Sequence, residues 1–265
     1  MYQVNYHRAD SVADAARMLA NGDARLLSGG MTLIPAMKTR LAAPSDLVDI
    51  SRIDALKGVS VSGDTVTIGA ATTHYEVAND AALKKACPAL AHLASLIGDP
   101  AVRHKGTIGG SIANNDPAAD YPAALLALDA TITTDKRSIA AGDFFTGLFE
   151  TALEEGEIVT SVSFAAPAKA GYEKFRNPAS RYAIVGVFVA NGKDGVRVAV
   201  TGAGDNGVFR SKEIEAALAT NFDVSAIQNI TVSPANLMGD IHASADYRAH
   251  LVTVMARRAV AAANA

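Results

Sequence analysis

The stretch from Thr107 to Tyr121 constrains this chain most, because its glycines, hydroxyls, amides and carboxylates suit neither an average helix nor a buried strand. Gly109-Gly110 allows positive φ and lets another group approach the backbone closely. Asp116 and Pro117 are expected to begin a helix that continues to Leu128. Free N–H groups aimed by such a helix suit a polar or anionic ligand. A tight turn with a well-made cap explains the same residues equally well.

A second glycine pair lies in the turn from Ser28 to Leu33, between a predicted strand at 24–27 and a predicted helix at 36–41 that Pro35 opens. Five consecutive backbone N–H groups, from Gly29 to Leu33, have the spacing to wrap a phosphate at a helix N-terminus. The turn is neither a Walker A loop, since no Gly-Lys-Ser/Thr follows, nor a GxGxxG fingerprint. The alternative is a strand–helix turn that needs small residues.

The 265 residues suffice for two or three subdomains, and we expect an α+β fold. Residues 1–57 read as a small α/β lobe with parallel pairing. Its strands are predicted at 2–6, 24–27 and 47–50, and its first helix at 12–20, begun by Ser11 and stopped by Asn21-Gly22. Residues 58–166 read as an antiparallel α+β lobe, with strands at 59–62, 65–71, 130–134 and 157–164 and a helix at 89–97.

A linker is predicted at 167–171, and residues 167–265 are expected to form a C-terminal domain. Strands at 172–175, 183–190 and 196–200 predict a three-stranded antiparallel sheet, with a tight reversal at 191–195 and covering helices at 212–219 and 245–263. The glycines of 202–207 also suggest a nucleotide site, but they rank below the two Gly-Gly motifs because no helix follows immediately.

Composition excludes several classes of function. The net charge of −3 gives no basic surface for nucleic acid. The single cysteine, Cys87, excludes a disulfide framework and an iron–sulfur cluster held by this chain's own cysteines, and no base is recognisable that would make it a nucleophile. The histidines lack metal-ligand spacing and read as surface or satisfied polar positions, so no metal site is predicted. We find neither a signal peptide nor a transmembrane segment, and expect a cytoplasmic protein.

The two Gly-Gly motifs, roughly 80 residues apart, together resemble the FAD-binding medium subunit of the molybdenum hydroxylases. This family includes the carbon monoxide dehydrogenase flavoprotein and the flavin domain of xanthine dehydrogenase. Residues 28–32 resemble its first flavin motif, and residues 107–111 match the second. The residues on either side of the second motif, at 97–103 and 116–122, also agree with the family pattern. The same holds for Glu157-Ile-Val and Arg181-Tyr-Ala. The resemblance implies a two-lobed, PCMH-like FAD-binding domain over 1–166, with lobes at about 1–57 and 58–166.

The resemblance also implies which residues contact FAD. Backbone N–H groups of residues 29–33 would bind the pyrophosphate, and Asp120 would lie against the cofactor. Ile158 and Val159 would line the flavin or adenine pocket, and Tyr182 would cover the isoalloxazine ring. From the residues alone, Asp120 also reads as a turn cap, and the other three as ordinary strand residues. The full implied set is Leu26, Leu27, Ser28, Gly29, Gly30, Met31, Thr32, Leu33, Ile97, Thr107, Gly109, Gly110, Ser111, Ala113, Asp120, Ile158, Val159 and Tyr182; no catalytic side chain is implied.

The function implied is that of a redox subunit. A large subunit would oxidise substrate at molybdopterin, a small subunit would carry [2Fe–2S] clusters, and FAD on this chain would pass the electrons to an external acceptor, in a dimer of heterotrimers. Met31, Asn114-Asn115 and Ile184 depart from the family pattern. Two alternatives are an assembly subunit that no longer binds flavin and a stand-alone flavin reductase or oxidase.

Overall fold

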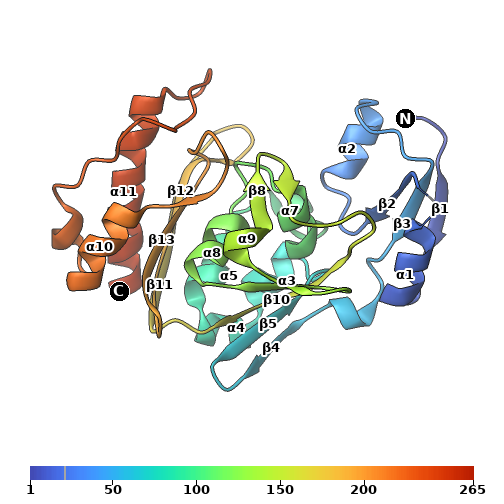
Figure 1. Cartoon of the computed structure of the whole chain (residues 1–265), viewed down its shortest axis with the longest axis horizontal. Coiled ribbons are helices and arrows are strands. Elements are labelled where there is room, and N and C mark those ends of the chain that lie inside the picture. Colours follow the sequence, from blue (N-terminus) through green and yellow to red (C-terminus); the bar gives the residue numbers. More distant parts are fainter. Residues whose placement is uncertain (21) are drawn as a thin grey trace.

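A computed structural model describes residues 1–20 and 22–265 (Figure 1), so the predicted helix stop at Asn21 lies outside the described residues. The first lobe is a three-stranded parallel sheet with the strand order β1-β3-β2, which confirms the predicted parallel pairing. Two of its elements are displaced from their predicted positions, since the first strand begins at Asn5 and the second helix begins before Pro35. Its elements are β1 (Asn5–Arg8), α1 (Val12–Leu19), β2 (Ala24–Leu27), α2 (Leu33–Lys38), β3 (Asp46–Asp49) and a 3₁₀ turn, η1 (Asp54–Leu56).

The second lobe contains a five-stranded antiparallel sheet with the order β4-β5-β10-β6-β7, as the period-two alternation predicts. The predicted turn at Gly63-Asp64 joins the first two strands, with Gly63 at φ 58°. Helices α3, α4, α5, α7 and α8 pack with this sheet around one apolar core. The elements are β4 (Val59–Ser62), β5 (Thr65–Gly69), α3 (His74–Asn79), α4 (Ala81–Ala86), α5 (Pro88–Ser95), α6 (Pro100–Arg103), α7 (Ile108–Asn114), α8 (Tyr121–Ala127), β6 (Thr131–Thr134), β7 (Ser138–Ala140), α9 (Ala141–Phe144), β8 (Phe145–Gly147), β9 (Glu150–Thr151) and β10 (Val159–Ala165).

The C-terminal sheet has four strands in the order β11-β12-β13-β14, one more than predicted. The additional strand is only two residues long, too short for any alternation to show in the sequence. The first strand begins at Lys169, inside the segment predicted to be a linker. The elements are β11 (Lys169–Arg176), β12 (Ala183–Gly192), β13 (Gly195–Thr201), β14 (Phe209–Arg210), α10 (Lys212–Thr220), η2 (Val224–Ile227) and α11 (Ala245–Asn264).

This sheet is a layer shared by two cores. Along β12, Phe188 and Ala190 belong to the core of the second lobe, whereas Val187 and Val189 pack in the core beneath α10 and α11. Burial on both faces explains why the strand reads as a continuous apolar run. Figure 1 shows α10 and α11 on one side of the sheet and α5 and α8 on the other. Within the described ranges, no helix combines the length and apolarity needed to cross a bilayer.

Gly171 allows β11 and α11 to pack closely. A Cβ at this position would overlap the backbone carbonyl oxygen of Ala259, and a backbone atom moves only with its helix. We expect Gly171→Ala to lower the free energy of unfolding by about 1–3 kcal/mol, as overpacking does. Gly142→Ala is the matched control, because a Cβ there meets nothing within 4 Å. Urea unfolding of both variants checks this; equal stability of the two would contradict the packing described.

Candidate functional site

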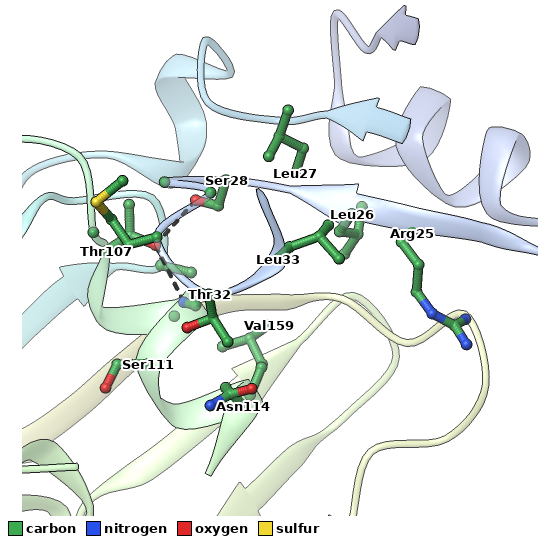
Figure 2. Close-up of a pocket in the computed structure, with 18 of the residues that line it drawn as sticks. Arg25, Leu26, Leu27, Ser28, Thr32, Leu33, Thr107, Ser111, Asn114 and Val159 are labelled. Carbon is green, nitrogen blue, oxygen red and sulfur yellow. Dashed lines mark hydrogen bonds between the residues drawn. The ribbon is translucent and has the colours of Figure 1, made fainter. Parts of the chain in front are cut away.

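A cavity of about 810 Å³ lies between the first two lobes. Its size falls within the range usual for small-molecule and cofactor sites, about 300–1,000 Å³. The β2–α2 turn, α7, the start of β10 and the segment at 180–182 all contribute to its wall, and Figure 2 shows the first three around one space. Every residue named above as an implied FAD contact lines it. The residues that the resemblance implies therefore form one contiguous surface, although their contacts with FAD stay predictions.

The turn between β2 and α2 presents unpaired backbone donors. Among the described residues, the N–H groups of residues 29–33 have no acceptor in the protein, and the first to find one is Ile34, whose N lies 3.1 Å from the O of Gly30. Gly30 has φ 71°, a backbone conformation that is costly for a residue with a side chain. A run of free N–H groups at a helix start attracts an anion. The prediction of five available donors is therefore matched by the geometry.

The second glycine motif differs from its prediction, because Gly109-Gly110 lies in the first turn of α7 rather than in a loop. Neither glycine has positive φ. Their N–H groups are already paired: Gly109 donates to the Ala70 carbonyl at 2.8 Å, and Gly110 donates to the Thr107 hydroxyl, which caps the helix, at 3.2 Å. The expected free N–H groups are thus absent at these two glycines, since Ala70 and Thr107 accept their hydrogen bonds.

The two glycines of this motif serve different purposes. A Cβ on Gly109 would lie 2.6 Å from the Cβ of Ala70, so this glycine lets α7 pack on the neighbouring segment. Within 4 Å, a Cβ on Gly110 would meet only the Thr107 hydroxyl, at 3.0 Å. Because Gly110 also lines the cavity, its missing side chain leaves room on the cavity side. The two motifs meet directly, with Ser28 Oγ 3.0 Å from Thr107 Oγ1 (Figure 2).

Asp116-Pro117 does not begin a helix as predicted. The carboxylate of Asp116 accepts a hydrogen bond from the N–H of Ala118 at 2.9 Å and forms a local turn. The helix α8 starts at Tyr121, with Pro122 in its first turn. Asp and Pro suit both a turn and a helix start, so the local sequence does not separate these outcomes.

Asp120 precedes α8 but does not cap it, so its interpretation as a turn cap is wrong. It lines the cavity while its carboxylate accepts hydrogen bonds from the Tyr172 hydroxyl and from Lys174. Tyr182 lies just outside β12 with 46% of its surface exposed, so it is not an interior strand residue. Burial raises the pKa of the Tyr182 phenol, and the charges of Asp116 and Asp120 raise it further. These acidic residues and Tyr182 therefore gather at one end of the cavity.

Ile158 and Val159 are buried, which confirms their interpretation as core residues; they also line the cavity, while their contact with the cofactor stays a prediction. Arg181 donates to the Gly98 carbonyl at 3.2 Å and ties the segment beside Tyr182 to the opposite wall. The loop at 202–207 lies away from the cavity. A Cβ on Gly202 would lie 2.4 Å from the Ala183 carbonyl oxygen, and one on Gly204 would lie 2.3 Å from the Gly207 carbonyl oxygen. Its glycines thus serve packing.

His74 was missed as a cavity residue. It is buried at the start of α3, and its Nδ1 lies 3.2 Å from the Tyr121 hydroxyl. Burial lowers the pKa of His74 to about 4, and Arg103 adds to this effect, so the ring is neutral at physiological pH. It is a satisfied polar position, as predicted, yet it lines the cavity. Only long-range contacts reveal this, as they do for Arg25, Asn114, Asp116 and Glu155, which also line it.

Cys87 and Asn115 have structural environments. Burial raises the pKa of the Cys87 thiol to about 12, which leaves it unreactive, as expected. Asn115 ends α7 at φ 42°, and its side-chain amide donates to the carbonyls of Gly147 and Glu150 at 2.9 and 2.7 Å. This departure from the family pattern therefore anchors the β8–β9 hairpin.

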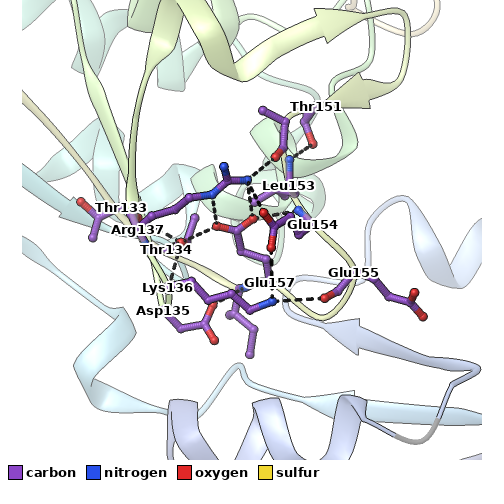
Figure 3. Close-up of polar contacts among 12 residues, drawn as sticks. Thr133, Thr134, Asp135, Lys136, Arg137, Thr151, Leu153, Glu154, Glu155 and Glu157 are labelled. Atoms are coloured by element: carbon purple, nitrogen blue, oxygen red, sulfur yellow. Dashed lines mark hydrogen bonds and ion pairs between the residues drawn. The ribbon is translucent and has the colours of Figure 1, made fainter.

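A buried carboxylate supports the cavity wall around Ile158. Glu157 forms a two-point ion pair with Arg137, in which both N–O distances are 3.0 Å. The Glu157 carboxylate also accepts a hydrogen bond from the Thr134 hydroxyl at 2.7 Å and one from the N–H of Glu154 at 2.8 Å (Figure 3). The hydrogen bonds from Arg137 are the largest cause that lowers the pKa of Glu157 to about 2. The network fixes the loop that carries Ile158 to the β6–β7 hairpin.

We expect Glu157→Gln to lower the free energy of unfolding by about 1–3 kcal/mol near neutral pH, since it weakens charged hydrogen bonds. The folded-state pKa lies below the ordinary 4.5, so the stabilisation is complete above pH 4.5 and disappears as the pH falls through about 2. The difference between variant and wild type should shrink over that window in urea unfolding. Glu154→Gln, at a side chain 62% exposed, is the control and should change stability by less than about 0.5 kcal/mol. A constant difference across the window would contradict this assignment.

Comparison with known proteins agrees with these features. The family described as FAD binding domain in molybdopterin dehydrogenase matches residues 2–167. The carbon monoxide dehydrogenase medium chain of Hydrogenophaga pseudoflava is 34% identical, over 97% of this chain and 96% of that one. The glyceraldehyde dehydrogenase medium chain of Sulfolobus acidocaldarius is 35% identical, over 97% of each. The solved carbon monoxide dehydrogenase of H. pseudoflava has a TM-score of 0.88 over 99% of this chain and 97% of that chain, at 34% identity. The chain belongs to the family of FAD-binding medium subunits of the molybdenum hydroxylases.

Proposed function

We propose that this chain passes electrons from the [2Fe–2S] clusters of a small partner subunit, by way of FAD in the cavity, to an external acceptor. A large molybdopterin-binding subunit would oxidise the substrate, and the complex would be a dimer of heterotrimers in the cytoplasm. The relatives are medium chains of such dehydrogenases, which supports partner subunits. The observation that carries the proposal is the run of unpaired N–H groups at residues 29–33 beside a cavity of about 810 Å³.

The residues present suit FAD. Five free N–H groups match a pyrophosphate, and Gly29 and Gly30 let it approach the backbone. The hydroxyls of Thr107 and Ser111 would hold the diphosphate–ribityl region, with room provided at Gly110. Ile158 and Val159 offer apolar surface to a ring of the cofactor, and Tyr182 would cover the isoalloxazine. Bound flavin supplies the redox chemistry, while the protein orients and encloses it.

The proposed domain boundaries follow the sheets of the fold. Residues 1–166 would form the FAD-binding domain, with lobes at about 1–57 and 58–166 that enclose the cofactor between them. Residues 167–265 would form the C-terminal domain of the subunit. The change from a parallel to an antiparallel sheet, and the separate sheet that follows, support these boundaries.

The departures from the family pattern do not favour an assembly subunit without flavin. Met31 stands in a turn that would bind through its backbone, so the identity of that side chain matters less than the free N–H. Asn114 lines the cavity, and Asn115 holds the neighbouring hairpin. A stand-alone reductase is less well supported, because the similar proteins are subunits.

Gly110→Val tests the proposal in the assembled complex. The branched side chain would enter the cavity beside Thr107, and we expect flavin content to fall at least about tenfold while the helix still forms, since Val costs a helix well under about 1 kcal/mol. The substrate should still bleach the iron–sulfur clusters, but reduction of an external acceptor should be lost. Gly142→Val, in α9 and clear of other atoms, is the control.

Two results of this experiment would contradict the proposal. Full flavin content in the folded Gly110→Val complex would remove the site. A flavin-free complex that reduced the acceptor at the wild-type rate would remove the electron-transfer role. Gly30→Val is a poorer test than Gly110→Val. Gly30 has positive φ, and a Cβ added there would lie 2.8 Å from the Ile34 side chain, so the substitution would strain the turn itself.

Tyr182→Ala should leave FAD bound, because the free N–H groups and the rest of the cavity remain. We expect higher fluorescence from the bound flavin and faster reoxidation by oxygen, since an aromatic cover worth roughly 1 kcal/mol of stacking is removed. The thermal midpoint should change little, because the side chain is already 46% exposed. Tyr75→Ala, at a side chain 45% exposed and outside the cavity, is the control. Unchanged fluorescence in the Tyr182 variant would remove this residue from the site.

A further inference from the structure

A buried ion pair joins the cavity to the C-terminal sheet. Asp120 lines the cavity, and its side chain is 4% exposed; the side chain of Lys174 is 2% exposed, with Nζ 2.9 Å from Asp120 Oδ1 and 3.1 Å from Oδ2. The hydroxyl of Tyr172 also donates to Oδ1. Both donors belong to β11, so within the described structure the C-terminal sheet is what fixes this carboxylate.

The geometry of β11 explains how both donors reach the same carboxylate. Tyr172 and Lys174 are two residues apart, so their side chains stand on the same face of β11. On β12, Gly186 is the register partner of Lys174. A Cβ on Gly186 would lie 2.5 Å from the Tyr172 hydroxyl oxygen, so the glycine leaves the space that this hydroxyl occupies beside Asp120.

The same sheet also holds the loop that leads to Asp120. The Thr201 hydroxyl donates to the carbonyls of Ala119 and Pro117 at 2.6 and 3.1 Å, and the N–H of Gly202 donates to Pro117 at 2.9 Å. All these donors lie beyond residue 167, where the match to the FAD-binding domain family ends. One wall of the cavity thus depends on residues outside the segment recognised as FAD-binding.

We propose that Tyr172 and Lys174 are positioning residues of the flavin site, which hold the Asp120 carboxylate in one orientation at the cavity wall and through it set the reduction potential of bound flavin. This inference rests on the proposed function, in that FAD must occupy the cavity. Reduction adds negative charge to the flavin, and a nearby charge acts strongly where water is excluded. Lys174 offsets the negative charge of Asp120, so its loss makes reduction harder.

The test uses the full-length chain loaded with FAD and measures the flavin midpoint potential by spectroelectrochemical titration. We expect Lys174→Met to bind FAD and to shift the midpoint to a more negative potential, and Lys174→Arg to restore it towards the wild-type value. Tyr172→Phe should shift it in the same direction by a smaller amount. Lys169→Met, at an exposed position on the same strand, is the control and should leave it unchanged.

A second comparison separates positioning from general destabilisation. If both residues act through Asp120, Tyr172→Phe should cause no further shift in an Asp120→Asn background. A wild-type midpoint in FAD-loaded Lys174→Met, an equal shift in Lys169→Met, or additive shifts in the double variant would overturn the inference. If Lys174→Met fails to fold, an unchanged midpoint in Tyr172→Phe overturns it. A wild-type chain that binds no FAD would instead overturn the proposed function itself.

Discussion

The cavity depends on the close approach of the β2–α2 turn to the segment before α7. Gly29 lies so near the Lys105 carbonyl that a Cβ would overlap it, and Ser28 and Thr107 meet through their hydroxyls at 3.0 Å. The apolar core of the first lobe also takes in Ala71 and Ile158 of the second lobe, so this polar contact adds to apolar packing where the two lobes meet. A side chain at Gly29 would push the lobes apart and change the width of the cavity between them.

The two glycine motifs look alike in the sequence but provide different surfaces. At residues 29–33 the backbone donors stay unpaired, which suits an anion. At the start of α7 the donors of Gly109 and Gly110 are taken up by Ala70 and Thr107, so this side offers hydroxyls and open space instead. A pyrophosphate placed against the first motif would therefore leave the second to accommodate the adjoining part of the cofactor.

Local sequence signals were sufficient where structure follows from short-range rules. The strand at Ala24–Leu27 has its predicted bounds, and Ser11 caps α1 through the N–H of Asp14. The start of α7 differs from the predicted loop, because Gly109 packs there against Ala70, which lies far earlier in the chain. No local pattern marks such a contact.

The same limit applies to the candidate site. The resemblance supplied a set of residues that all line one cavity, but it did not reveal His74, whose burial depends on the fold, or the support that Arg137 gives to the wall through Glu157. In the sequence, Lys174 is an ordinary charged residue on an alternating strand. Only the three-dimensional structure, which brings β11 close to the residue before α8, makes it the partner of Asp120.

A crystal structure of the purified chain with FAD tests the central claim most directly. The account predicts the cofactor in the cavity between the first two lobes, with pyrophosphate oxygens within hydrogen-bond distance of the N–H groups of residues 29–33. Flavin bound elsewhere, or bound in the cavity with those N–H groups facing only water, would contradict it.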